Sequence, residues 1–123
     1  MAMPSADILE LTATALSRRI ASRDVSCREL MQASLERIEA LNPRFNAIVS
    51  LREPEVLLAE AAGRDAELAR GERRGWMHGF PLAVKDLSHA AGLPTSKGSP
   101  LSPARRRAPT ACTSRARARP APS

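Results

Sequence analysis

A lysine at the end of an apolar run is the first feature of this sequence that suggests chemistry. The run at residues 80–84 (FPLAV) leads directly into Lys85 and Asp86. We expect the run to form a buried strand, with the charged pair at its carboxyl end, where α/β folds place their functional groups. Partial burial lowers the pKa of a lysine, and a neutral amine can act as a general base or nucleophile. A surface lysine paired with Asp86 would also explain this local pattern.

Other residues with reactive side chains give weaker signals. His78 and His89 flank the lysine segment without an acidic cluster, which is typical of loop histidines rather than metal ligands. Cys27 and Cys112 are the only cysteines, so neither a disulfide framework nor a metal site is predicted, and no cofactor is expected. Free thiols, no secretory signal and no long apolar stretch together predict a cytoplasmic protein that does not enter a membrane.

Three helices and one further strand are predicted to position the lysine segment. Residues 5–21 have apolar residues at helical spacing, and Ser5 is expected to cap this helix. Ser26 and Glu29 form a capping-box pattern that opens a second helix, which Asn42-Pro43 should end. Residues 45–51 (FNAIVSL) suit a strand. Residues 53–70 return to helix with a proline in the first turn, and residues 71–75 suit a polar loop.

The charge of the chain is concentrated at one end. Residues 1–100 hold 13 basic and 13 acidic residues, so the net charge of +6 comes from six arginines in residues 101–123. This tail consists of Leu, Ser, Pro, Ala, Arg, Thr and Cys, and we expect it to be disordered. A neutral body with a basic tail makes nucleic acid a disfavoured partner, and interleaved aromatic residues are missing. Binding through the tail remains an alternative, as does a helical interaction module at residues 5–70.

The spacing around Lys85 resembles that of the amidase signature family. Residues 76–87 resemble its G-x-P, three residues, K-D pattern through Gly79, Pro81, Lys85 and Asp86. Residues 91–95 (AGLPT) and 95–99 (TSKGS) resemble the two elements that follow it in the family. Upstream, the I-x-x-L-N-P helix end and the F-N-A sequence at residues 38–47 also match. The resemblance extends over about residues 5–100, with the motifs in the family order.

The resemblance implies a fold, a reaction and one site residue. It implies that residues 1–100 are the N-terminal helices and first strands of an α/β/α amidase fold. The family hydrolyses amide C–N bonds, or transfers the ammonia released, with a Ser–cis-Ser–Lys triad. Lys85 corresponds to the lysine, which would pass protons through a bridging serine to the nucleophile. The substrate would be a small-molecule amide, and aryl, fatty, peptide and glutaminyl-tRNA-type amides all remain open.

The sequence departs from the family after residue 100. Both family serines lie in a downstream Gly-Ser-rich stretch, which these 123 residues do not contain. We therefore expect a truncated amidase fragment that is inactive alone, because Lys85 lacks its nucleophile. The Arg/Ala/Pro composition of residues 101–123 is typical of GC-rich DNA translated in a shifted frame, so we expect a frameshift near residue 100. A complementary C-terminal fragment is an alternative partner.

Overall fold

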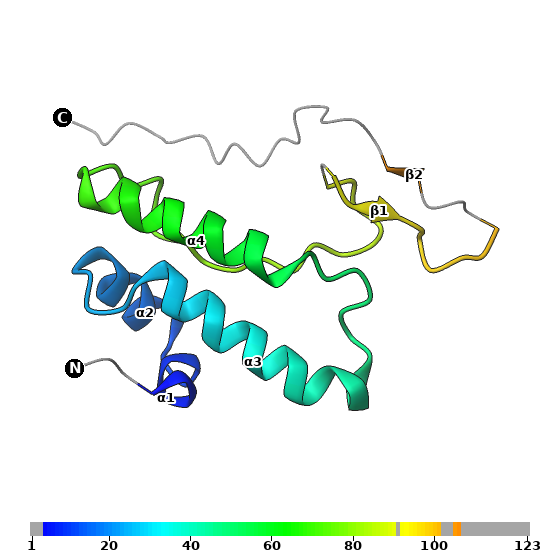
Figure 1. Cartoon of the computed structure of the whole chain (residues 1–123), viewed down its shortest axis with the longest axis horizontal. Coiled ribbons are helices and arrows are strands. Elements are labelled where there is room, and N and C mark those ends of the chain that lie inside the picture. The colour runs from blue at the N-terminus through cyan, green and yellow to red at the C-terminus, as the bar shows by residue number, and fades with distance from the viewer. Residues whose placement is uncertain (1–3, 91, 102–104, 107–123) are drawn as a thin grey trace. The chain divides into compact units, whose positions relative to one another are not determined.

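The computed structural model describes residues 4–90, 92–101 and 105–106, which divide into two compact units. The first unit ends at Pro81 and the second begins at Leu82. The first unit is helical, with α1 at Ser5–Leu9, α2 at Ala13–Ala21, α3 at Cys27–Phe45 and α4 at Pro54–Ala69 (Figure 1). The second contains two short strands, β1 at Pro94–Thr95 and β2 at Arg105–Arg106. None of the helices in the described part of the chain has the length and apolarity needed to cross a membrane.

The helical unit has its own apolar core. Helix α3 packs against both α1 and α4, and α3 and α4 lie side by side (Figure 1). The largest of the fully buried side chains come from α1, α2, α3 and the turn between α2 and α3. They are Ile8, Ile20, Val25 and Cys27. Leu16, Leu30 and Ala61 complete the core. Aliphatic side chains therefore supply most of the apolar burial in this unit.

The N-terminal helical region is divided, contrary to the single helix predicted at residues 5–21. Helix α1 ends at Leu9, and α2 begins after Thr12, whose hydroxyl accepts a hydrogen bond from the Ala15 N–H at 3.2 Å. Ser5 lies inside α1 rather than capping it, because Pro4 occupies the N-cap position. An apolar pattern at helical spacing continues across such a break, so periodicity alone does not reveal the new start at Thr12.

The predicted start of α3 is confirmed, while its predicted end is wrong. Ser26 and Glu29 form the capping box, with the Ser26 N–H donating to the Glu29 carboxylate at 2.8 Å. The helix then continues through Pro43 to Phe45 and ends at Asn46, which has a left-handed conformation with φ of 49°. A proline removes one helical N–H donor, yet here the helix continues for two more residues.

The strand predicted at residues 45–51 is not formed. Phe45 belongs to α3, and residues 46–53 are an irregular loop. The side-chain amide of Asn42 donates to the Ile48 carbonyl at 2.8 Å, and its oxygen accepts from the Ile48 N–H at 2.9 Å. Backbone groups need partners, and those of Ile48 are satisfied by this side chain instead of by a neighbouring strand. The next element, α4, agrees with the prediction and has Pro54 in its first turn.

The second unit also differs from its prediction. Residues 80–84 form no strand among the described residues, and Leu82 and Val84 are 74% and 46% exposed rather than buried. The predicted first strands of an α/β/α sheet are therefore not observed. β1 and β2 instead form an antiparallel pair in which Thr95 lies opposite Arg105. Arg105–Arg106 was expected to be disordered, and the remaining tail beyond Leu101 lies outside the described residues.

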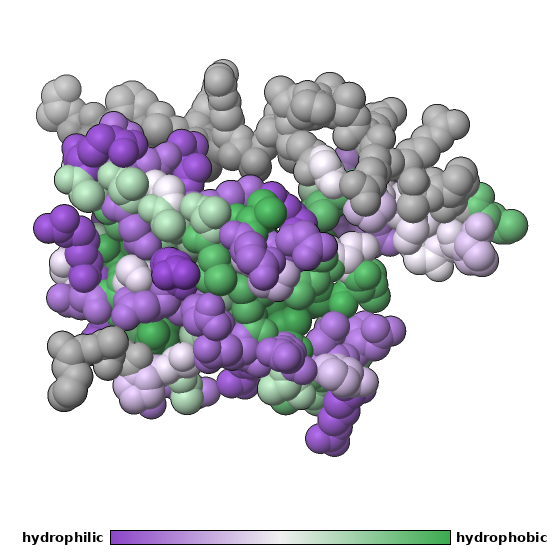
Figure 2. Space-filling view, viewed as in Figure 1, coloured by the Kyte–Doolittle hydropathy of each residue, from purple (hydrophilic) through white to green (hydrophobic). Residues whose placement is uncertain are grey.

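Many hydrophobic side chains reach the surface of the chain. Figure 2 shows them in green among the hydrophilic residues. The large ones in the helical unit are Leu41, Phe45, Val49, Leu51, Val56, Trp76 and Met77. In the second unit they are Leu82, Val84, Leu87 and Leu101. The core therefore covers only part of the apolar surface that the described residues carry.

Candidate functional site

Lys85 lies on the surface of the second unit. Its side chain is exposed, so the predicted burial of this lysine is not observed. Its carbonyl accepts the Ser88 N–H at 2.8 Å, which places Lys85 at the start of a tight turn. Among the ion pairs of the described residues none joins Lys85 to Asp86, so the explanation as a surface pair is not supported either.

Asp86 is held by a second turn ten residues further along the chain. Its Oδ1 accepts the Ser96 N–H at 2.8 Å, and its Oδ2 accepts the Ser96 hydroxyl at 2.5 Å. The Gly98 N–H also donates to Oδ2, at 3.2 Å. These hydrogen bonds stabilise the charged carboxylate and therefore lower the pKa of Asp86, with the Ser96 hydroxyl as the largest cause. The carboxylate is thus held by neutral donors and not by a basic side chain.

The turn that receives Asp86 has an uncommon backbone conformation. The Ser99 N–H donates to the Ser96 carbonyl at 3.1 Å. The two central residues, Lys97 and Gly98, have φ of 55° and 66°. Positive φ at both central positions is the pattern of a type I′ turn, and it is uncommon for a lysine. Hydrogen bonds to Asp86 from Ser96 and Gly98, on either side of Lys97, favour the conformation.

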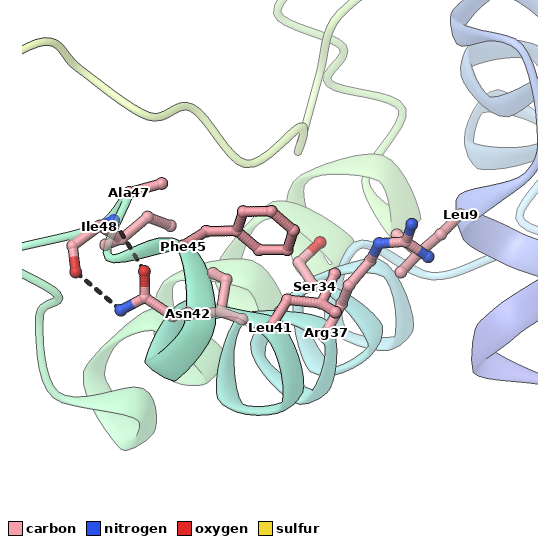
Figure 3. Close-up of a pocket in the computed structure, with 9 residues that line it drawn as sticks. Leu9, Ser34, Arg37, Leu41, Asn42, Phe45, Ala47 and Ile48 are labelled. Atoms are coloured by element: carbon pink, nitrogen blue, oxygen red, sulfur yellow. Dashed lines mark hydrogen bonds between the residues drawn. The ribbon is translucent and has the colours of Figure 1, made fainter.

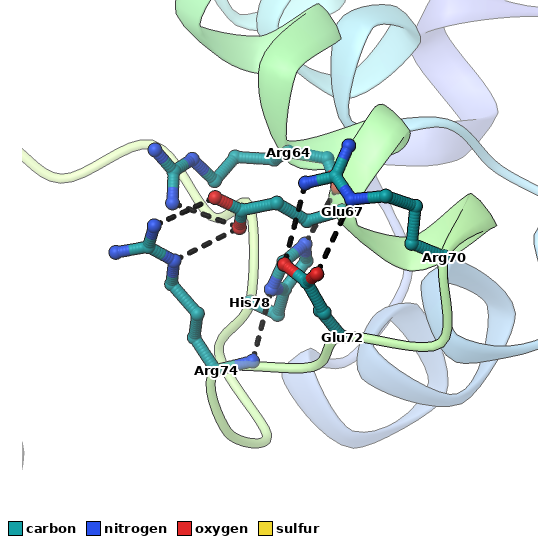
Figure 4. A network of polar contacts seen from close by, with 6 residues as sticks. All are labelled: Arg64, Glu67, Arg70, Glu72, Arg74 and His78. Carbon is teal, nitrogen blue, oxygen red and sulfur yellow. Dashed lines mark hydrogen bonds and ion pairs between the residues drawn. The ribbon is translucent and has the colours of Figure 1, made fainter.

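A polar network joins residues 71–78 to the helices of their unit (Figure 4). Glu67 in α4 accepts two hydrogen bonds from the Arg74 guanidinium, at 2.6 and 2.8 Å, and a third from Arg64 at 2.9 Å. The bidentate hydrogen bonds from Arg74 are the largest cause that lowers the pKa of Glu67. Desolvation raises this pKa, and the charge of Arg64 lowers it further. The Ser17 hydroxyl also donates to the Trp76 carbonyl.

His78 is the buried centre of this loop, only 4% exposed. Its Nδ1 accepts the Arg74 N–H at 3.1 Å, and its Nε2 lies 2.9 Å from the Arg64 carbonyl. Because Nδ1 accepts a hydrogen bond and Nε2 faces a carbonyl oxygen, these contacts fit the neutral ring with its proton on Nε2. The prediction that His78 is a loop residue is confirmed. Its structural function was not visible in the sequence, because Arg64 lies 14 residues away.

Gly79 explains the first position of the motif around Lys85. Its φ is 76°, and a Cβ built at this position would overlap Cys27 at the start of α3. Any larger residue would therefore meet both steric overlap and backbone strain. The glycine of the G-x-P pattern is therefore required by the packing of this unit.

An open apolar groove of about 350 Å³ lies elsewhere in the helical unit (Figure 3). Leu9, Leu41, Phe45 and Ile48 line it, with Ser34 and Arg37 as polar neighbours. It contains no pair of a nucleophile and a base. No group of three residues that could bind a metal ion occurs among the residues that the structure describes. Sequence patterns did not predict the groove, because it depends on the loop at residues 46–53.

Known proteins resemble about three quarters of this chain. It is 40% identical over 95 residues to a glutamyl-tRNA(Gln) amidotransferase subunit of Acidothermus cellulolyticus, and the match covers 77% of this chain and 19% of that protein. It is 47% identical over 90 residues to the corresponding subunit of Chromobacterium violaceum, covering 73% and 18%. It is 38% identical over 88 residues to an acylamidase of Rhodococcus erythropolis, covering 72% and 18%. The chain spans about a fifth of the length of these curated relatives.

A whole protein family also matches most of this chain. Residues 29–119 match the amidase family, and this range includes Lys85, Asp86 with its hydrogen-bond donors, and much of the basic tail. No solved structure matches the chain. Three quarters of the sequence thus carry the family pattern, and this chain belongs to the amidase family.

Proposed function

We propose that this chain supplies the lysine-bearing N-terminal part of an enzyme that hydrolyses amide C–N bonds. The observation that carries the proposal is the position of Lys85 inside the matched region, at the end of the G-x-P, three residues, K-D pattern. Lys85 would be the base of the triad. It would accept a proton, relayed through a bridging serine, as the nucleophilic serine attacks the amide carbonyl.

The exposed position of Lys85 bears on this role. A lysine accepts a proton only in its neutral form, which a low-polarity surrounding favours. The described residues leave Lys85 and its neighbours Leu82, Val84 and Leu87 exposed. In the proposed enzyme, further parts of a longer amidase domain cover these side chains and bring the serines to the lysine. The 123 residues alone are expected to be inactive, since they lack the Gly-Ser-rich stretch.

The substrate class is an amide, and the relatives suggest two directions. Two of them are amidotransferase subunits by name, and one is an acylamidase. An enzyme built on this chain would take either a small acyl amide or an amide donor for transfer. In the second case it would work in a complex with other subunits. A separate fragment that carries the serines is a further partner consistent with the proposal.

A chimeric enzyme tests the role of Lys85. The matched segment of the Rhodococcus erythropolis acylamidase is replaced with the corresponding residues of this chain, and hydrolysis of an acyl amide is measured. We expect the chimera to be active, and Lys85→Ala to lower kcat about 10²- to 10⁴-fold, the range of general acid–base catalysis. Glu39→Ala, an exposed change in α3, serves as the matched control.

Two results would count against the proposal. A folded but inactive chimera would overturn amide hydrolysis as the function of this N-terminal part. An active chimera that tolerates Lys85→Ala would retain the function and remove the lysine from it.

The predicted domain boundary at residue 100 and the frameshift stay predictions, and the genomic DNA tests them. The family match continues to residue 119, which favours an unshifted frame over at least part of the tail. The DNA beyond codon 100 is read in all three forward frames. A Gly-Ser-rich continuation in another frame would support the frameshift, whereas its absence from every other frame would overturn it.

A further inference from the structure

A clamp of hydrogen bonds around Asp86 links the two turns of the second unit. One turn runs from Lys85 to Ser88, and the other from Ser96 to Ser99. Asp86 belongs to the first turn, and all three of its hydrogen bonds go to the second. A second link runs in parallel, since His89 Nδ1 lies 3.3 Å from the Thr95 hydroxyl. The backbone that carries Lys85 is thus fixed by contacts to residues 95–98.

The clamp also determines which groups the carboxylate of Asp86 binds. A carboxylate next to a lysine in sequence is free to pair with it unless other donors bind it more favourably. Here Ser96 and Gly98 occupy both oxygens of Asp86. The carboxylate accepts from two backbone N–H groups and one hydroxyl, which is a favourable set for the ionised form. Without this set, an ion pair with Asp86 would stabilise the protonated form of Lys85 and oppose its use as a base.

We propose that Asp86 is a positioning residue for Lys85, which it serves by holding the Lys85–Ser88 turn against the Ser96–Ser99 turn and by keeping its own carboxylate off the lysine amine. This inference rests on the proposed function, because positioning matters only if Lys85 acts as the base. The clamp itself does not depend on activity. The two parts can therefore be tested separately.

The clamp is tested by NMR on the 123-residue chain, without any assay of activity. On acidification we expect the amide signals of Ser96 and Gly98 to shift together, with a midpoint below the ordinary value of 3.8, because their hydrogen bonds hold the pKa of Asp86 down. The Lys85 and Ser88 amides should shift at the same midpoint, as the turn that carries the lysine loosens. Asp86→Asn should abolish this common transition and raise the exchange rate of the Ser88 amide proton.

Asp24→Asn is the matched control for the clamp. Asp24 is exposed in the helical unit and also accepts a hydrogen bond from a serine, since the Ser22 hydroxyl donates to it at 2.7 Å. This variant should leave the four amide signals of the second unit unchanged. If neither acidification nor Asp86→Asn shifts the amide signals of Ser96 and Gly98, the clamp is overturned, and the positioning role with it.

The effect on the reaction is measured in the acylamidase chimera. Asp86 touches no substrate in the proposed mechanism, so Asp86→Asn should lower kcat about 10- to 100-fold, as expected for a misplaced catalytic group, while KM stays nearly constant. The pH profile of kcat should also shift, because the charge next to Lys85 has changed. An unchanged kcat in an active chimera would overturn the positioning role alone. An inactive parent chimera would overturn the proposed function and leave the clamp, which the NMR experiment measures, in place.

Discussion

Residues 71–81 and residues 82–101 are adjacent in sequence but are held in different ways. The first segment is fastened to the helices by the Glu67–Arg74 pair, by buried His78 and by the close approach of Gly79 to Cys27. The second is held by contacts within its own unit, which are the hydrogen bonds of Asp86 and the pairing of β1 with β2. Its apolar side chains at Leu82 and Leu87 are exposed. The family motif crosses this junction, with Gly79 and Pro81 on one side and Lys85 and Asp86 on the other.

The comparison separates two kinds of information in one motif. The first half of the motif fits the chain to a helical core that is present within these residues. In the proposed function, the second half places a lysine whose chemistry needs groups that these residues do not supply. Changes in the first half should therefore alter the stability of this chain, and changes at the lysine should not.

The largest effect is expected from Gly79→Ala. The new methyl group would overlap Cys27, and φ of 76° is unfavourable for alanine. Overpacking and a left-handed backbone together should lower the free energy of unfolding by about 3 kcal/mol. Gly71→Ala has nearly the same φ, 79°, with nothing nearby, and should cost about 1 kcal/mol. Urea unfolding followed by circular dichroism distinguishes them, and equal losses would contradict the steric explanation.

A smaller effect is expected where α4 caps α3. Asp65 accepts the Cys27 and Arg28 N–H groups at 2.7 and 3.1 Å, so it satisfies two donors at the start of α3 from 38 and 37 residues away. Asp65→Ala should lower the free energy of unfolding by about 1–2 kcal/mol, the range for loss of an N-cap. The same unfolding experiment on Asp24→Ala, a surface change, should give a loss near zero. A tolerated Asp65→Ala would show that the capping box at Ser26 suffices.

The ion pair between Glu67 and Arg74, which fastens the first segment, should make the stability of the chain depend on pH. The pKa of Glu67 is lowered below its ordinary value of 4.5 in the folded chain, first by its hydrogen bonds with Arg74. The ion pair therefore stabilises the fold above that value, and the contribution is lost as the pH falls through the lowered pKa. Glu67→Gln should lower the melting temperature at pH 7 and have less effect at pH 3. Exposed Glu39→Gln should show no such difference between the two pH values.

The smallest effect on stability is expected at the lysine itself. Lys85 is exposed and has no ion pair among the described residues, so Lys85→Met should change the free energy of unfolding by less than about 0.5 kcal/mol. Unfolding of the two proteins under identical conditions provides the measurement. A large loss would indicate that Lys85 is a structural residue and would weaken its assignment as a base.

Sequence reasoning succeeded where the determining contacts are local. The capping box of Ser26 and Glu29 and the proline at the start of α4 are formed by residues within one helical turn. The predicted strands at residues 45–51 and 80–84 failed because a strand needs a partner from elsewhere in the chain. Asn42 supplies a different partner for the first, and none is present for the second among the described residues.

The candidate site divides in the same way. Lys85 was proposed as a site residue from its motif, whose order and spacing are local, and this stays a prediction. The function of Asp86 was missed because its partners lie ten to twelve residues away, although an aspartate followed by a Ser-Lys-Gly-Ser turn was a usable signal. The exposure of Lys85 could not be predicted, since burial depends on neighbours that are distant in sequence.

The buried thiol of Cys27 can serve as a probe for opening of the helical unit. Its side chain is fully buried, and burial, with a further contribution from the hydrogen bond to Asp65, raises its pKa to about 12. Alkylating reagents attack the thiolate, so in the closed unit they have almost no target at neutral pH. In a chain that carries Cys112→Ser, alkylation of Cys27 would then require the helical unit to open. The alkylation rate would therefore report on this opening.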